Sequence, residues 1–131
     1  MVGRTQEAGS RGRQVLVVDD EDTIRDTLVD ILAKSGYVAV GAADGREGLR
    51  KLRAAAFGLV LLDLTMPVMD GRAFRVAQRR DPALARIPVI VLSAFPDLAV
   101  RAADLEATAY LSKPISVPVL LELVRVRLSQ S

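Results

Sequence analysis

The sequence predicts an α/β fold, a doubly wound parallel sheet of five strands with a helix after each strand. Two observations support this prediction. After residue 13, short continuous apolar runs alternate with segments of helical periodicity, and the alternation occurs five times. The apolar runs have no polar face, which is typical of parallel strands that helices cover on both sides. The length of 131 residues fits one domain, here residues 14–131.

The five predicted strands are short apolar runs with polar residues at their ends. The first is the run VLVV, and the third, FGLVLLD, ends at an aspartate. Pro88 lies near the start of the fourth strand, where a missing backbone N–H is tolerated. The predicted strands are residues 15–18, 37–40, 57–63, 87–92 and 108–112.

The predicted helices have apolar residues at helical spacing and, in several cases, recognisable ends. Gly36 follows the first helix, at a position where glycine commonly ends a helix. Asp44 and Glu47 form a capping box at the start of the second helix. The fourth helix is short, over residues 98–105, and Ser116 can cap the last one.

Composition excludes several classes of function. The chain has no cysteine and no histidine, so it can form no disulfide, no thiolate or histidine metal site and no Ser-His-Asp catalytic group.

Residues 1–13 hold three arginines and one glutamate among several glycines, and we expect a flexible tail there. Residues 14–131 balance 15 basic and 15 acidic side chains, which argues against a nucleic-acid partner. No apolar run is long enough to span a membrane, and no signal peptide precedes the first strand, so we expect a cytoplasmic protein without a membrane partner.

Polar residues stand at the carboxyl ends of the predicted strands, where ligands bind in doubly wound sheets. Asp19 and Asp20 follow the first strand and Asp63 ends the third. Ser93 ends the fourth strand and Lys113 follows the fifth. Because parallel strands end at one edge of the sheet, we expect the three carboxylates to converge and to need a counter-charge.

Four motifs at these positions resemble the receiver domain of bacterial response regulators, the two-component signalling proteins. They are VVDDE, LLDLTMPVMDG, VLSA and YLSKP, in the order and at the strand ends that the family shows. The resemblance covers residues 14–131 and includes the chemotaxis members of the family. It implies a flavodoxin-like (βα)5 fold with the parallel strand order 2-1-3-4-5.

The resemblance also implies a metal site for Mg²⁺, with Mn²⁺ as the alternative. Asp20 is expected to bind the ion directly and Asp19 through a water. Asp63 and the backbone carbonyl of Thr65 complete the ligand set. Mg²⁺ usually keeps several waters and takes only one or two carboxylates plus phosphate oxygens. Asp20 to Asp22 could also serve simply as favourable charges at a helix N-terminus, which is the reading we favour for Asp22.

Asp63 is, by this resemblance, the phosphoacceptor. Lys113, Ser93 and Ala94 would bind the phosphoryl oxygens, and the Lys113–Pro114 peptide bond would be cis. Ser93 and Tyr110 would form the switch, in which the hydroxyl moves toward the phosphoryl group and the aromatic ring turns inward.

Two further positions bear on the lifetime of the phosphorylated form. Thr65 and Phe95 flank the acceptor in the family and line the approach of the hydrolytic water. Phe95 has no polar group to orient a water, so we expect slow autodephosphorylation. Alternatively, Phe95 turns away and packs against the fourth helix. The chain departs from the family at Glu106, where glycine is frequent. If this position needs a left-handed conformation, a residue other than glycine costs roughly 1 kcal/mol there; the alternative is a turn of a different shape.

The predicted function is that of a phosphorylation-gated switch without enzymatic activity beyond self-phosphorylation and slow autodephosphorylation. A histidine kinase or small phosphodonor would supply the phosphoryl group, and the surface of helix 4, strand 5 and helix 5 would then control binding of a downstream protein. We expect no output domain. A phosphorelay intermediate that passes phosphate to a histidine phosphotransferase is the alternative. A flavodoxin is not supported, because carboxylates follow the first strand where a flavodoxin has its phosphate-binding loop. A dehalogenase-type phosphatase is not supported either, because Thr65 stands where that family has its second aspartate.

Five arginines cluster around the third predicted helix. We favour a solvated face for them, with an acidic partner surface as the alternative. The five arginines are Arg72, Arg75, Arg79, Arg80 and Arg86. The oligomeric state is left open.

Overall fold

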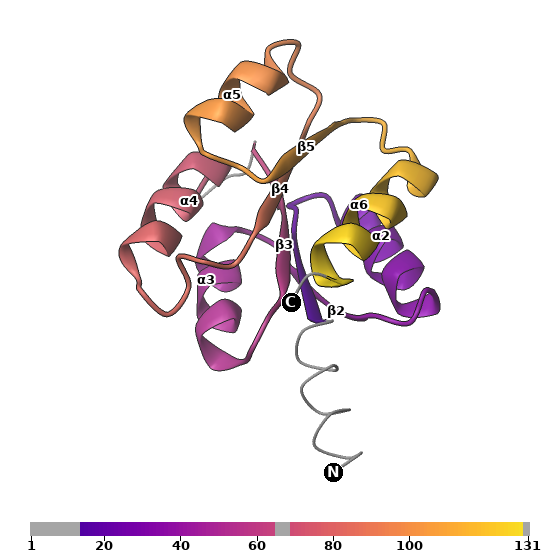
Figure 1. Ribbon diagram of the computed structural model, residues 1–131, viewed down its shortest axis with the longest axis horizontal. Helices are drawn as coiled ribbons and strands as arrows, with labels where there is room; N and C mark the ends of the chain where they lie inside the picture. Colours follow the sequence, from indigo (N-terminus) through magenta and orange to yellow (C-terminus); the bar gives the residue numbers. More distant parts are fainter. Residues whose placement is uncertain (1–13, 65–68, 130–131) are drawn as a thin grey trace.

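The computed structural model of the chain describes residues 14–64 and 69–129. The predicted tail, residues 1–13, and Thr65 lie outside the described residues. Five parallel strands form one sheet in the order β2-β1-β3-β4-β5, which confirms the predicted fold class and strand order (Figure 1). The strands are β1 (Gln14–Val18), β2 (Val38–Ala42), β3 (Leu59–Asp63), β4 (Val89–Ser93) and β5 (Ala109–Ser112).

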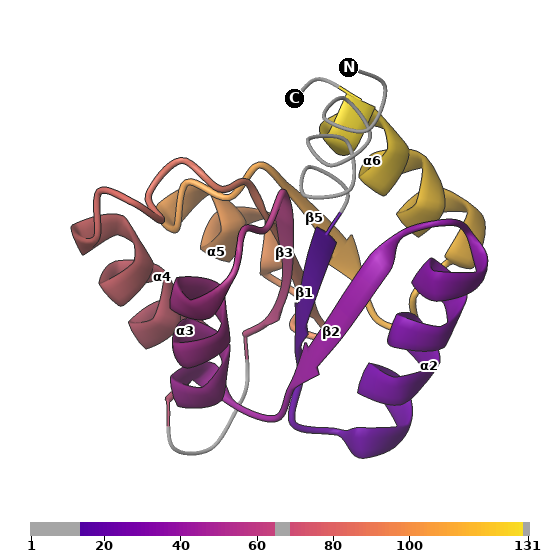
Figure 2. The ribbon, with the colours of Figure 1, turned by 90° about the horizontal axis from the view of Figure 1, so that it is seen from below.

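Helices cover both faces of the sheet. Figure 2 shows α3, α4 and α5 on one side of the strands and α2 and α6 on the other. The helices are α2 (Asp22–Lys34), α3 (Gly45–Ala54), α4 (Gly71–Arg80), α5 (Leu98–Asp104) and α6 (Val117–Ser129). Within the described ranges, no helix combines the length and the apolarity that crossing a membrane requires.

The core consists of two apolar clusters, one on each face of the sheet. Successive residues of a strand point to opposite faces, so Val60 and Leu62 of β3 belong to the cluster beneath α3, α4 and α5. Leu59 and Leu61 of the same strand belong to the cluster beneath α2 and α6. All residues of β3 and β4 are buried, which explains why their sequences read as continuous apolar runs.

Side-chain caps fix where two helices begin beside the carboxyl edge of the sheet. An Asp44 carboxylate oxygen accepts a hydrogen bond from the Glu47 amide at 2.9 Å, which is one of the two bonds of the predicted capping box. The Glu47 carboxylate does not return the bond but pairs with Lys51 at 3.0 Å. Asp70 caps α4 in the same way, accepting from the amide of Ala73 at 2.8 Å.

Candidate functional site

The sheet brings the predicted site residues to one edge. β1 and β3 are neighbours at its centre, with Val18 in register with Leu62, so Asp19 and Asp63 leave the sheet side by side. β4 lies next to β3 and contributes Ser93 at its last position. Lys113 follows β5, and its amide donates to the Ser93 carbonyl at 2.9 Å. The convergence expected from the strand ends is therefore present.

Three carboxylates meet at this edge in different environments. Asp19, Asp20 and Asp63 each place an oxygen within 4.8 Å of the others. Asp19 is fully buried and Asp63 is 4% exposed, whereas Asp20 is exposed to solvent. One oxygen of Asp19 accepts a hydrogen bond from the Glu21 amide at 3.0 Å, which fixes the carboxylate at the start of α2.

Lys113 supplies a positive charge to the two buried carboxylates. Its ammonium lies 3.2 Å from Asp19 Oδ2 and 3.5 Å from Asp63 Oδ1. Burial lowers the pKa of Lys113, but attraction by Asp63 and Asp19 and hydrogen bonds to both outweigh that effect and raise the pKa. The lysine is therefore charged at neutral pH. The Lys113–Pro114 bond is cis, as the resemblance implies.

The donor set suits a hard divalent cation. One ammonium faces three carboxylates, so the ionised cluster retains an excess of negative charge. Its donors are carboxylate oxygens, which Mg²⁺ prefers, and Asp20 opens the cluster to solvent, which leaves access for bound waters. The residues present therefore fit Mg²⁺. The fourth expected ligand, the carbonyl of Thr65, lies outside the described residues.

The two predicted switch residues lie in contrasting positions. Ser93 is 2% exposed, and its hydroxyl oxygen accepts a hydrogen bond from the Phe95 amide at 2.9 Å. Ala94 follows it and is exposed. Tyr110, on β5, is 48% exposed, so its ring lies at the surface in this structure. The movement of Ser93 and Tyr110 stays a prediction.

Phe95 lies beside α5, the fourth of the helices predicted from the sequence. Its side chain is partly buried against the cluster beneath α5, and the guanidinium of Arg101 in α5 lies 4.1 Å from the ring centroid. A cation over an aromatic face is favourable. Its effect on water access to Asp63 stays a prediction.

The arginine cluster around α4 is not uniformly a solvated face, and the expectation is wrong for Arg75. This side chain is 8% exposed. Its guanidinium donates to the carbonyls of Leu105 and Glu106 and to Gln78 Oε1, at 2.9, 3.0 and 2.9 Å respectively. Burial and neighbouring Arg79 lower the pKa of Arg75, partly offset by Glu106. An arginine stays charged under these conditions, so Arg75 ties α4 to the turn that precedes β5.

Glu106 in that turn has the left-handed conformation, with φ of 53°, which is the first of the two possibilities that the sequence left open. Its amide donates to the Ala103 carbonyl at 3.0 Å, as in a helix C-terminal turn. Its carboxylate pairs with Arg79 of α4. The chain therefore retains the backbone conformation without the glycine that usually favours it.

Gly71 is a site-forming residue whose role the sequence reasoning missed. A Cβ added there would lie 2.8 Å from the carbonyl oxygen of Asp63 and 2.8 Å from the Cα of Leu64. Only glycine lets the first turn of α4 approach the end of β3 this closely. The signal was available, because the quoted motif LLDLTMPVMDG ends in this glycine, directly after the cap residue Asp70.

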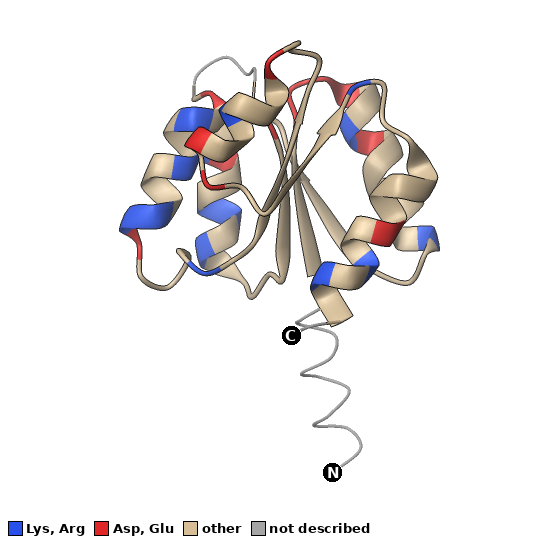
Figure 3. Ribbon diagram, turned by 45° about the horizontal axis from the view of Figure 1, so that its top comes forward, with Lys and Arg blue, Asp and Glu red and all other residues tan. Residues whose placement is uncertain are grey.

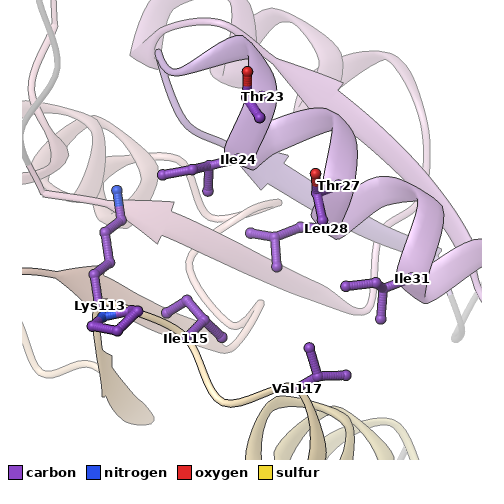
Figure 4. Close-up of a pocket in the computed structure, with 9 residues that line it drawn as sticks. Thr23, Ile24, Thr27, Leu28, Ile31, Lys113, Ile115 and Val117 are labelled. Atoms are coloured by element: carbon purple, nitrogen blue, oxygen red, sulfur yellow. The ribbon is translucent and has the colours of Figure 1, made fainter.

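An apolar hollow of about 230 Å³ lies beside Lys113. Figure 4 shows side chains of α2 facing Ile115 and Val117 across it, with Lys113 at one end. Ile24, Leu28 and Ile31 form the α2 wall.

Comparisons with known proteins agree with this arrangement. The sequence profile of the response regulator receiver domain matches residues 15–125. The chain is 37% identical to the transcriptional regulatory protein PdtaR of Mycobacterium tuberculosis over 136 aligned positions, which cover 99% of this chain and 64% of that protein. It is 37% identical to a probable chemotaxis protein CheY of Rhizobium etli, over 79% of this chain and 83% of that one. The chain thus spans less than two thirds of the mycobacterial regulator.

Solved structures show the same similarity. The receiver domain of a signal transduction histidine kinase from Syntrophus aciditrophicus superposes with a TM-score of 0.82 at 34% identity, covering 89% of this chain and 90% of that one. The chemotaxis protein CheY4 of Vibrio cholerae superposes with a TM-score of 0.79 at 34% identity, covering 86% and 95%.

Proposed function

Because the chain belongs to the response regulator receiver domain family, we propose that it is a signalling switch gated by phosphorylation of Asp63. The observation that carries the proposal is the cluster of Asp19, Asp20 and Asp63 with the Lys113 ammonium 3.5 Å from Asp63 Oδ1.

The proposed reaction is phosphoryl transfer from a histidine of a partner kinase. An Asp63 oxygen attacks the phosphorus, the P–O bond forms, and the P–N bond breaks with its electron pair leaving on the imidazole. Residues 1–131 contain no histidine, so the donor histidine lies outside this sequence, unless a small phosphodonor takes its place. Lys113 neutralises charge on the phosphoryl oxygens, since such transfers depend mainly on positioning and electrostatic stabilisation.

Mg²⁺ is the proposed cofactor. Asp20, Asp19 and Asp63 would hold it together with the Thr65 carbonyl, and the bound ion would neutralise phosphoryl oxygens during transfer. The structure supports this through the donor chemistry and convergence of the three carboxylates.

The proposed output is a change of surface. Ser93 would release the Phe95 amide and donate its hydroxyl to a phosphoryl oxygen, with the backbone of Ala94 as a second donor. Tyr110 would then turn from its exposed position toward the space that Ser93 leaves. The face formed by α5, β5 and α6 would present a different surface to a downstream protein.

The apolar hollow between α2 and the segment after β5 supports docking of a histidine-bearing partner. Lys113 is itself one of the residues that line this hollow. A helix bound there would therefore bring its own side chains to the edge of the sheet where Asp63 lies. Leu28 and Val117 stand on its opposite walls.

Intact-mass measurement tests the proposed reaction. With Mg²⁺ and acetyl phosphate, the wild-type protein should gain the mass of one phosphoryl group, stable in acid and labile in base. Asp63→Asn should gain none, and a chelator should nearly abolish the gain in wild type. Asp26→Asn, a 74% exposed carboxylate on α2, is the matched control and should be modified normally. A modified Asp63→Asn protein would refute the assignment.

A further inference from the structure

We propose that the groove between α4 and α5 docks an acidic, partly apolar segment of a partner protein. Two hollows of about 340 and 300 Å³ lie along these helices. They share Arg72, Asp104 and Leu105 in their linings, so they lie next to each other, and the two together are the groove meant here. The inference uses residues with no part in the proposed phosphoryl transfer and does not rest on that proposal.

Positive charge is concentrated on the helices at one side of this groove. Figure 3 shows blue bands gathered on two neighbouring helices, α3 and α4, which pack against each other. Residues 45–54 and 71–80 hold eight basic side chains and one acidic. Elsewhere in residues 14–131, seven basic side chains face fourteen acidic ones. The net charge of residues 14–131 is therefore zero, but the charges are unevenly distributed. The basic side fits a negatively charged partner.

Helix electrostatics do not explain Arg72. Arg79 and Arg80 stand in the last turn of α4, where the helix dipole favours cations, but Arg72 stands in the first turn, where it disfavours them. Arg79 pairs with Glu106 in the turn after α5. Within the described part of the chain, no ion pair joins Arg72 or Arg80 to a carboxylate. Two exposed cations at the groove are thus available for an external partner.

The apolar part of the lining favours a protein segment over a nucleic acid. Val76, on α4 between the arginines, is 42% exposed, and Val100, on α5, is 62% exposed. No aromatic residue is among the lining residues, so bases would find no stacking platform. Asp70, Asp97 and Asp104 also line the groove, and they would repel a uniformly charged phosphate backbone. A segment that combines carboxylates with aliphatic side chains meets both features.

The size of the groove sets the length of the segment. α4 has 10 residues and is therefore about 15 Å long. An extended segment of about five residues covers that distance. So small a contact gives weak, salt-sensitive binding, typical of transient interfaces.

The test is an NMR titration of the full ¹⁵N-labelled chain, unphosphorylated, with a peptide of alternating glutamate and leucine at low salt. Amide shifts should concentrate on α4 and α5. The double variant Arg72→Glu with Arg80→Glu should weaken binding by about tenfold or more. Lys34→Glu with Arg125→Glu makes the same change in net charge at exposed positions of α2 and α6, and should stay within about twofold of wild type.

A second pair of variants tests the apolar contact. Val76→Ser should weaken peptide binding several-fold, whereas Val119→Ser, at a similarly exposed valine on α6, should not. Circular dichroism melts check that all variants fold. The proposal is overturned if no shifts appear at about 1 mM peptide, if both charge-reversal pairs weaken binding equally, or if an oligothymidylate binds as tightly as the peptide while Val76→Ser has no effect.

Discussion

Replacing Arg75 by methionine should destabilise the domain although the substituted residue lies outside the acidic cluster. Methionine keeps much of the length and apolar stem of the side chain but removes the guanidinium. The Leu105 carbonyl and Gln78 Oε1 then lose their Arg75 donors in a buried setting, and the Glu106 carbonyl loses one in a partly buried setting. The expected effect is therefore a loss of hydrogen bonding within the fold.

The magnitude follows from these three bonds. A hydrogen bond to a charged group contributes about 1.5–3 kcal/mol, and a buried acceptor left without a donor costs about 1–3 kcal/mol. Burial of the guanidinium, which lowers the pKa of Arg75, offsets part of the gain. We expect a net loss of about 2–4 kcal/mol in the free energy of unfolding. In a domain of this size that corresponds to a fall of about 8–16 °C in melting temperature.

Urea unfolding followed by circular dichroism measures this change directly. Arg72→Met is the matched control, because Arg72 is exposed on the same helix and should change stability by less than about 0.5 kcal/mol. Arg75→Lys should fall between wild type and Arg75→Met, since one ammonium cannot span acceptors that the planar guanidinium reaches together. An Arg75→Met protein within about 0.5 kcal/mol of wild type would refute the structural role of the guanidinium.

Four further outcomes are expected. Glu106→Gly should be more stable than Glu106→Ala by about 1 kcal/mol in thermal melts, because both lose the ion pair and only glycine adopts positive φ without strain; equal stability would contradict this. Gly71→Ala should lower the melting temperature and slow phosphorylation of Asp63 in the mass assay, since its Cβ meets the end of β3; normal values in both would remove the packing argument. Mg²⁺ should raise the melting temperature of wild type, and Asp20→Asn should lose most of this rise while melting higher than wild type without metal; a clearly less stable metal-free variant would contradict carboxylate repulsion. Finally, Phe95→Glu should shorten the phosphate lifetime several-fold by holding a water, and an unchanged or longer lifetime would show that Phe95 does not control water access.

Much of the fold could be predicted because each layer of the structure leaves a direct trace in the sequence. β3 and β4 are buried on both faces and read as unbroken apolar runs. The acidic cluster could be predicted because parallel strands end at a common edge, so residues far apart in sequence meet there without any side-chain detail. Strand ends were less exact: β2 extends to Ala42, beyond the predicted residue 40, because its backbone continues to pair with β1.

Arg75 shows why the rest could not be predicted in the same way. Its acceptors lie 30 and 31 residues further along the chain, in a turn whose position depends on the packing of α5. One signal was present. Gly71, Phe74, Arg75 and Gln78, the buried residues of α4, follow the spacing of an amphipathic stripe, so Arg75 stands where an inward-facing residue belongs. Charge favoured the solvated interpretation, although a buried arginine with enough acceptors satisfies the same pattern. The rotamers of Ser93 and Tyr110 could not be predicted in this way, because one sequence is compatible with more than one rotamer of each side chain.

Helix α4 contacts the end of β3 and the turn before β5 at different points along its length. Its first residue, Gly71, packs against the backbone of Asp63 and Leu64, and one turn later Arg75 holds the carbonyls of Leu105 and Glu106. The first contact depends on where the helix backbone lies, and the second on a single side chain. A substitution that displaces α4, such as Gly71→Ala, should therefore alter both stability and phosphorylation. Arg75→Met leaves the helix start and its Asp70 cap in place. It should therefore lower the free energy of unfolding clearly and change the rate of phosphorylation of Asp63 less.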